Sequence, residues 1–244
     1  MLSTPTPIDT DSAALFLDVD GTLLDIESHP DDVRATPELR DLLDRLLADL
    51  EGAMALISGR TIESLDAIFA PSCYPACGAH GAEIRLAGGA STTAIEHPMT
   101  DEALAALENF AAAHEGIVLE HKPGGASLHY RQAPGFERQA RELVQRVFEE
   151  MLTGFRVIDG KMVLELAPVD ANKGEAIDAV MAEAPFAGRR PVFIGDDTTD
   201  EDGFRVVNKL GGTAILVGSR TPTAATFALP DVAAVHQWLR DSVR

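Results

Sequence analysis

The chain has 244 residues, enough for one large domain or two small ones. Hydrophobic residues make up 45% of it and charged residues 24%, which allows a sizeable core and excludes global disorder. With 20 Lys and Arg against 39 Asp and Glu, the formal net charge is −19, which argues against nucleic acid or an anionic membrane as a partner. An anionic ligand would therefore need a local source of positive charge.

The sequence lacks an apolar run of about 18 residues, so we expect no membrane span. Residues 1–12 are polar, without the basic and apolar segments of a secretory signal. Two cysteines, Cys73 and Cys77, are too few for a disulfide scaffold. We therefore expect a cytoplasmic protein, and the sequence leaves its oligomeric state open.

The first third of the sequence alternates between apolar runs and amphipathic segments. The apolar runs predict buried strands at 13–18 and 53–57. Leucines at helical spacing predict a helix between them, from Pro37 to the break at Gly52, and a second helix is expected over 61–69. This order predicts parallel strands joined by crossover helices.

The pattern changes after about residue 80. Short strands are predicted at 83–86, 117–120, 126–131, 155–158 and 162–166, helices at 101–114 and 136–151, and turns at Gly88-Gly89 and 122–125. Adjacent strands with short turns predict an antiparallel sheet with helices on one face, a separate α+β unit.

The alternation resumes near Asn172, with helices at 173–183, 201–208 and 232–243, strands at 191–194 and 213–217, and an acidic loop at 195–202. The predicted fold is therefore α/β, a Rossmann-like parallel-sheet core interrupted by an inserted α+β domain.

Two acids, Asp18 and Asp20, come directly after the first predicted strand, in the segment D-V-D-G-T-L (18–23). Residues i and i+2 of an extended segment point the same way, so the two carboxylates share one face. They lie at the carboxyl end of a strand, where open α/β sheets hold ligands. A cation or a shared proton would relieve their repulsion, and the alternative is a turn with two solvated acids.

A second acidic segment, residues 195–202, follows the predicted strand at 191–194. Its acids are Asp196, Asp197, Asp200, Glu201 and Asp202. Hard oxygen ligands on few carboxylates, with water completing the shell, suit Mg²⁺. The alternative is an acidic helix start, which applies to residues 200–202 more than to Asp196.

Two further segments carry phosphate-binding chemistry. In Ser58-Gly59-Arg60 a hydroxyl follows a strand, and in Asn172-Lys173-Gly174 a lysine stands at a helix start. Hydroxyl and backbone N–H groups there can hold phosphate oxygens. Each segment alone is more typical of a turn serine or a solvated lysine.

The order of the four segments resembles that of the haloacid dehalogenase-like (HAD) phosphohydrolases: D-x-D-G-T-L, a serine after the next strand, a lysine, then G-D-D-x-x-D. Finer segments are similar to the trehalose-6-phosphate phosphatase family: 78–81 (G-A-H-G), 120–123 (E-H-K-P), 129–131 (H-Y-R), 164–166 (L-E-L), 172–174 (N-K-G) and 195–201 (G-D-D-T-T-D-E). The resemblance covers residues 16–217. Gly125 departs from it, because the family's P-x-G-K-A stretch has Lys at that position.

The resemblance implies a HAD core over residues 1–95 and 168–244, with an inserted cap over residues 96–167 that selects the substrate. Asp18 would be the nucleophile and Asp20 the general acid and base. Mg²⁺ would be held by Asp18, the Asp20 carbonyl and Asp196, supported by Asp197 or Asp200. Ser58, Gly59 and Lys173 would bind the phosphate, and Lys173 and the metal would supply the local positive charge.

In the cap, the resemblance makes Glu120, Lys122, His129, Arg131 and Glu165 the candidate sugar-binding residues. Residues two apart on a strand share a face, which groups Glu120 with Lys122 and His129 with Arg131. The alternatives are a cross-strand salt pair for the Glu and Lys side chains and a structural role for His129. Arg60 either orients its motif or pairs with an acid.

The implied partner is a small-molecule sugar phosphate, and trehalose 6-phosphate is the expected substrate. Another capped sugar phosphatase, acting on sucrose phosphate or mannosyl-3-phosphoglycerate, is the main alternative, because the core chemistry is shared. A phosphomutase is less expected, since it must protect its phospho-enzyme from water. A non-catalytic sugar-phosphate sensor would need a broken nucleophile, whereas Asp18 is intact.

Overall fold

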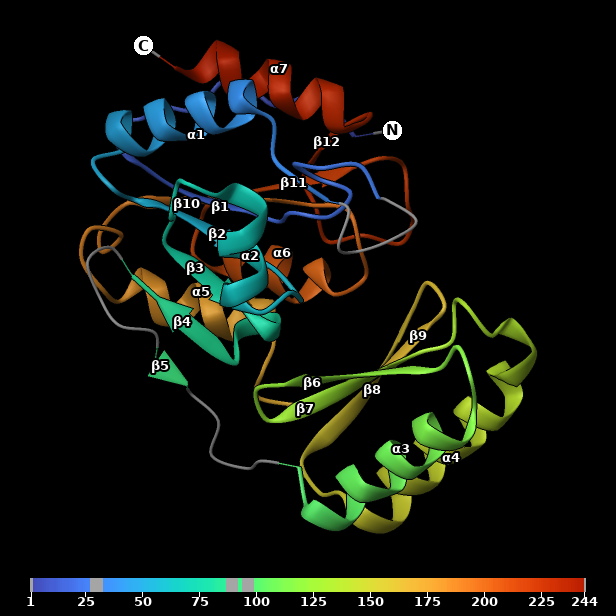
Figure 1. Cartoon of the computed structure of the whole chain (residues 1–244). Helices are drawn as coiled ribbons and strands as arrows, with labels where there is room; N and C mark the ends of the chain where they lie inside the picture. The colour runs from blue at the N-terminus through green and yellow to red at the C-terminus, as the bar shows by residue number, and fades with distance from the viewer. Residues whose placement is uncertain (1, 27–32, 87–91, 94–98, 244) are drawn as a thin grey trace. The chain divides into compact units, whose positions relative to one another are not determined.

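The computed structural model describes residues 2–26, 33–86, 92–93 and 99–243 (Figure 1). The chain separates into a larger unit, Met1–Thr92 with Asn172–Arg244, and a smaller unit, Thr93–Ala171. The predicted turn at Gly88-Gly89 and the predicted boundary between residues 95 and 96 lie outside the described residues. The return to the larger unit comes after Ala171, whose carbonyl accepts a hydrogen bond from Arg156 Nη2 (2.8 Å) within the smaller unit.

The larger unit is built on an eight-stranded sheet of order β12-β11-β10-β1-β2-β3-β4-β5. Its parallel strands are β1 (Ala13–Leu17), β2 (Met54–Ile57), β3 (Ala76–Gly78), β10 (Arg190–Gly195), β11 (Thr213–Val217) and β12 (Phe227–Leu229). The short β4 (Glu83–Arg85) runs antiparallel to β3, and β5 (Thr92–Thr93) ends the sheet. Strand β1 lies between β2 and β10, so the residues that follow these three strands meet at one edge.

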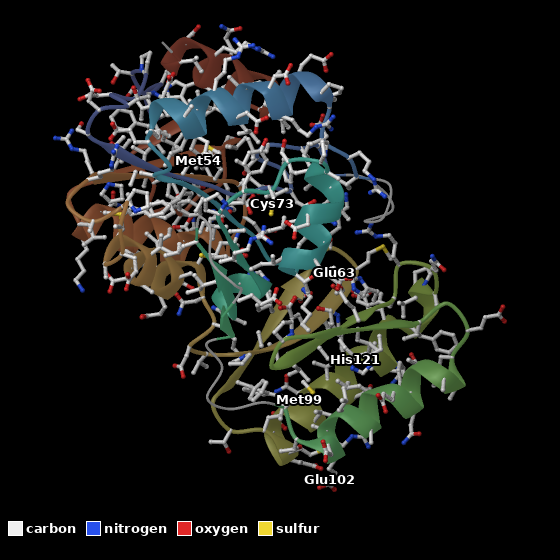
Figure 2. All side chains as sticks on the ribbon, turned by 60° about the vertical axis from the view of Figure 1, so that its left-hand side comes forward. Met54, Glu63, Cys73, Met99, Glu102 and His121 are labelled. Atoms are coloured by element: carbon white, nitrogen blue, oxygen red, sulfur yellow. The ribbon has the colours of Figure 1, made fainter. Side chains whose placement is uncertain are left out.

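Helices cover both faces of this sheet. They are α1 (Pro37–Asp49), α2 (Ile62–Phe69), α5 (Lys173–Met181), α6 (Asp200–Lys209) and α7 (Val232–Ser242). In Figure 1, α1 and α7 lie together on one face and α5 and α6 on the other. Met54 of β2, labelled in Figure 2, is completely buried between these layers.

Local sequence explains where these helices begin. The side chains of Thr36, Thr61, Asn172 and Asp231 each accept a hydrogen bond from a backbone N–H of the following helix. Such caps satisfy N–H groups that have no partner inside the helix. The strands β3, β5 and β12 were not predicted, because two or three residues are too few to establish a hydrophobic period.

The smaller unit is an antiparallel sheet of order β6-β7-β9-β8 with two helices on one face (Figure 1). The strands are β6 (Val118–Lys122), β7 (Gly125–His129), β8 (Phe155–Gly160) and β9 (Val163–Pro168), and the helices are α3 (Asp101–Ala113) and α4 (Glu137–Met151). Leu128, Leu164 and Leu166 pack against the helices. The predicted fold class, a parallel-sheet α/β core with an inserted α+β domain, is confirmed.

None of the helices in the described part of the chain is both long and apolar enough to cross a membrane.

Candidate active site

The carboxyl ends of β1, β2 and β10 bring together segments that are far apart in the sequence. Asp18 follows β1, and its N–H donates to the carbonyl of Ile194 in β10 (3.0 Å). Ser58 follows β2, and its N–H donates to the carbonyl of Cys77 in β3 (2.9 Å). Because these strands are parallel neighbours, three of the four predicted core segments, those of Asp18, Ser58 and Asp196, converge on one edge of the sheet.

Lys173, at the start of α5, lies between two buried carboxylates. Its Nζ donates to Asp18 Oδ1 (2.7 Å) and to Asp200 Oδ1 (2.6 Å), and all three side chains are at most 6% exposed. Burial alone would lower the pKa of Lys173, but the charges of Asp18 and Asp200 outweigh it and raise that pKa. Lys173 therefore stays protonated and provides the positive charge that an anionic ligand needs.

Three acids form a compact group beside this lysine. Ligand oxygens of Asp18, Asp196 and Asp200 all lie within 4.8 Å of one another. Burial raises the pKa of Asp18 well above its usual value, and Lys173 only partly opposes this. Burial, followed by the charge of Asp200, raises the pKa of Asp196 to about 7. Carboxylates placed this closely in a buried site repel one another unless a cation offsets their charge.

Unsatisfied oxygens in this group fit a hard divalent cation. Asp18 Oδ2 and Asp196 Oδ1 are buried and have no hydrogen-bond partner among the described residues. Buried acceptors without a partner are costly, and carboxylate oxygens are the ligands that Mg²⁺ prefers. Both oxygens of Asp200, in contrast, are used: Oδ1 by Lys173 and Oδ2 by the Asp197 N–H (2.8 Å). Asp200 therefore stabilises the group through Lys173 and the Asp197 N–H, which occupy its two oxygens.

The predicted ligand Asp197 lies outside this group. Its side chain is exposed, and its Oδ1 accepts hydrogen bonds from the N–H and hydroxyl of Thr198.

The turn after β1 approaches the group of three acids at Gly21, whose φ is +84°. A Cβ there would lie 2.3 Å from Asp196 Oδ2, so only glycine allows this approach.

Asp20 does not join the three acids but pairs with Arg60. Arg60 Nε donates to Asp20 Oδ2 and Arg60 Nη2 to Asp20 Oδ1, both at 2.6 Å. This two-pronged geometry is the strongest that guanidinium and carboxylate form. Of the two alternatives for Arg60, pairing with an acid is therefore the one found here.

Ser58 is almost completely buried, and its Oγ accepts a hydrogen bond from the Arg60 N–H (3.1 Å). The turn Ala79–Gly81 supports it: the His80 N–H donates to the Ser58 carbonyl (2.9 Å) and the Ala79 N–H to the Arg60 carbonyl (2.7 Å). A Cβ on Gly59 would lie 2.6 Å from His80 Nε2. The 58–60 turn is thus held closely against His80, with Gly59 making that approach possible.

Four predicted sugar-binding residues lie together on the sheet of the smaller unit. Glu120, Ser127 and Glu165 are directly opposite one another on β6, β7 and β9. Lys122 Nζ donates to Glu165 Oε2 (2.8 Å), and His129 Nε2 lies 2.9 Å from Glu120 Oε2. Alternation along each strand places these side chains opposite the face that packs on α3 and α4.

The Lys122–Glu165 pair is not on a solvated face, because its side chains are only 9% and 10% exposed. Ser127 Oγ also donates to Glu165 Oε2 (3.0 Å). Around Glu120, burial raises the pKa, but the hydrogen bond from His129 and the charge of Lys122 outweigh it and lower that pKa. The cross-strand salt pair named as the alternative is therefore present, in a buried and not a solvated position.

Arg131 lies beyond the strand that carries His129. Strand β7 ends at His129, so the alternation that would place Arg131 beside it does not continue. Arg131 Nη2 donates instead to the carbonyl of Lys161, between β8 and β9 (3.1 Å).

Two polar residues of these sites were missed by the sequence analysis. Ser127 could have been found, because it precedes His129 by two positions on a predicted strand and shares its face. Arg220, which donates to the Asp197 carbonyl (2.9 Å) and to Glu201 Oε1 (2.7 Å), lies in a loop with no motif to mark it.

The sequence is similar to those of known phosphatases. The trehalose-phosphatase family model matches residues 16–233. A trehalose-6-phosphate phosphatase of Escherichia coli (strain K12) is 41% identical over 97% of this chain and 88% of its own length. A probable trehalose-phosphate phosphatase of Sinorhizobium fredii is 40% identical over 93% of this chain and 86% of its own length.

Solved structures give the same result. The crystal structure of a trehalose-6-phosphate phosphatase related protein matches 94% of this chain and 96% of its own, with a TM-score of 0.75 and 25% identity. The C-terminal domain of the Candida albicans trehalose-6-phosphate phosphatase shares the fold, with a TM-score of 0.81 over 93% and 91% of the two chains at 21% identity. The family inferred from the sequence motifs is confirmed, and the chain belongs to the trehalose-phosphatase family of HAD-fold enzymes.

Proposed function

We propose that this protein is a Mg²⁺-dependent phosphatase that hydrolyses trehalose 6-phosphate to trehalose and phosphate through an aspartyl-phosphate. The observation that carries the proposal is the buried contact of Lys173 with Asp18 and Asp200, beside the unpartnered oxygens of Asp18 and Asp196. The substrate follows from membership of the trehalose-phosphatase family and from the cluster of hydroxyl-binding side chains in the smaller unit.

In the first step, an oxygen of Asp18 attacks phosphorus and the bond from phosphorus to the sugar oxygen breaks. Asp20 gives a proton to that departing oxygen, so free sugar and an aspartyl-phosphate result. In this structure both Asp20 oxygens accept hydrogen bonds from Arg60, so the acid step requires this ion pair to open.

In the second step, Asp20 takes a proton from water, and the water oxygen attacks phosphorus of the aspartyl-phosphate. The bond from phosphorus to the Asp18 oxygen breaks, which releases inorganic phosphate and restores the Asp18 carboxylate. Lys173 Nζ lies 2.7 Å from Asp18 Oδ1, so the same ammonium group stands beside the reacting Asp18 carboxylate in both steps.

Lys173 and Ser58 bind the non-bridging phosphate oxygens as negative charge moves across them. Asp18 and Asp196 would hold Mg²⁺, and the Asp20 carbonyl would be a further ligand. Asp200, whose Oδ1 accepts a hydrogen bond from Lys173, would support these ligands. When bound, the metal supplies positive charge that offsets the repulsion between the carboxylate nucleophile and the phosphate.

The sugar is recognised by the smaller unit, in which Glu120 and Glu165 accept hydrogen bonds from hydroxyls and Lys122 donates to them. His129 holds Glu120 through its 2.9 Å contact. We keep Arg131 as a further candidate on the ground of the family motif alone.

A phosphate-release screen over sugar phosphates tests this function most directly. We expect trehalose 6-phosphate to be the best substrate, with activity lost in EDTA and restored by Mg²⁺. Faster release from glucose 6-phosphate, sucrose 6-phosphate or mannosyl-3-phosphoglycerate would overturn the assigned substrate. Undiminished activity in EDTA would overturn the metal dependence but leave the substrate intact.

The substitution Lys122→Ala separates sugar recognition from the chemistry. We expect kcat/KM for trehalose 6-phosphate to fall by roughly 10²-fold, since Glu165 loses a buried charged partner as well as the sugar contact. Hydrolysis of p-nitrophenyl phosphate, which has no sugar, should change less than about twofold.

The matched control is Lys161→Ala, an exposed lysine of the same unit. It should leave both substrates unaffected. If Lys122→Ala reduced both activities equally, Lys122 would have no role in reading the sugar.

A further inference from the structure

The loop that follows β11 lies next to the acidic loop that follows β10. The two strands are parallel neighbours, with Gly195 opposite Leu216 at their carboxyl ends (Figure 1). Residues after these strands therefore meet at the same edge of the sheet as Asp18 and Asp196.

Arg220 joins the two loops. Its Nη2 donates to the Asp197 carbonyl (2.9 Å) and to Glu201 Oε1 (2.7 Å), and its Nε makes a longer contact with the Asp196 carbonyl (3.5 Å). A planar guanidinium can hold several acceptors in one fixed arrangement. Two consecutive backbone carbonyls, those of Asp196 and Asp197, are thus held by one side chain.

Glu201 completes the connection. Its Oε2 accepts the Ala224 N–H (2.7 Å), and its side chain is only 12% exposed. Burial raises the pKa of Glu201, but the Ala224 N–H and Arg220 outweigh it and lower that pKa. Glu201 is therefore a carboxylate that binds Arg220 and the Ala224 N–H, and it is not part of the group of three acids.

We infer that Arg220 is a positioning residue, which holds the 196–197 backbone so that the Asp196 carboxylate stays beside Asp18 and binds a divalent cation. This inference rests on the proposed Mg²⁺ dependence. Two physical effects of removing Arg220 have opposite signs. Loss of a nearby positive charge would strengthen cation binding, whereas loss of the fixed backbone would weaken it. The direction of the change therefore separates positioning from simple electrostatics.

The test is calorimetric titration of MgCl₂ into metal-stripped full-length protein without substrate. We expect Arg220→Gln to weaken Mg²⁺ binding about tenfold, in the range typical of residues that orient metal ligands. Arg220→Lys keeps the charge but loses the planar fork, so its affinity should fall between those of the parent and Arg220→Gln.

The matched control is Arg205→Gln. Arg205 pairs with Asp202, the next acid of α6 (2.6 Å), and is largely exposed. The Arg205→Gln substitution also removes one positive charge, and we expect the Mg²⁺ affinity of this variant to equal or slightly exceed that of the parent. Equal or tighter binding by Arg220→Gln would overturn the inference.

A second variant covers the case in which Arg220→Gln does not fold. Arg220→Lys serves here, because it keeps the positive charge, so Mg²⁺ binding weaker than that of the parent would follow from the lost planar contacts and not from electrostatics. Absence of Mg²⁺ binding by the parent protein would overturn the proposed metal dependence itself. Binding by the parent that neither variant weakens would overturn only the role of Arg220.

Discussion

Asp18→Asn is expected to lower kcat for trehalose 6-phosphate by at least about 10⁴-fold while the protein remains folded. An amide has nearly the shape of a carboxylate but cannot attack phosphorus, so the covalent step is lost. Folding should survive, because Lys173 keeps Asp200 as a charged partner at 2.6 Å. Phosphate release measures the activity, and circular dichroism with thermal unfolding measures the fold.

The control for this substitution is Asp66→Asn. Asp66 forms an ion pair of its own in the larger unit, with Arg85 at 2.6 and 2.7 Å, but it lies outside the group of three acids. Its activity should stay within about twofold of the parent, since partly exposed ion pairs contribute little. Near-normal kcat for Asp18→Asn would exclude Asp18 as the nucleophile and, with it, the aspartyl-phosphate.

The core segments could be predicted from the sequence because each follows a recognisable apolar strand. Asp18, Ser58 and Asp196 come directly after β1, β2 and β10, and parallel strands place such residues at one edge. Lys173 is different: its contact with Asp18 joins residues 155 positions apart. Its place at a helix start and the family motif pointed to it, but the local sequence does not show which acids it contacts.

Other features depend on tertiary contacts that no local pattern encodes. Arg220 has no motif, and its partners lie on a neighbouring loop that follows another strand. Asp20 and Asp18 were expected to share one face, yet both carboxylate oxygens of Asp20 accept hydrogen bonds from Arg60. Alternation along a strand grouped His129 with Arg131, but the strand ends at His129, so alternation alone does not place Arg131.

Removal of the Lys173 charge should affect stability and catalysis together. In Lys173→Met, Asp18 and Asp200 remain buried without their partner, which is expected to lower the free energy of unfolding by about 3–5 kcal/mol. kcat should also fall by roughly 10²–10³-fold, since the transferring phosphate loses a fixed cation. Urea unfolding and phosphate release measure the two effects, with Lys209→Met, an exposed lysine of α6, as the control.

The pH dependence of Lys173→Met gives a sharper test. A carboxyl whose pKa is raised on folding binds protons more readily in the folded state, so its effect on stability becomes less favourable as the pH rises. The pKa of Asp18 is already raised by burial despite Lys173, and that of Asp196 is about 7. The deficit of Lys173→Met relative to the parent should therefore be smaller at about pH 5 than at about pH 8. A deficit independent of pH would mean that Lys173 stabilises the fold by packing and not by neutralising these acids.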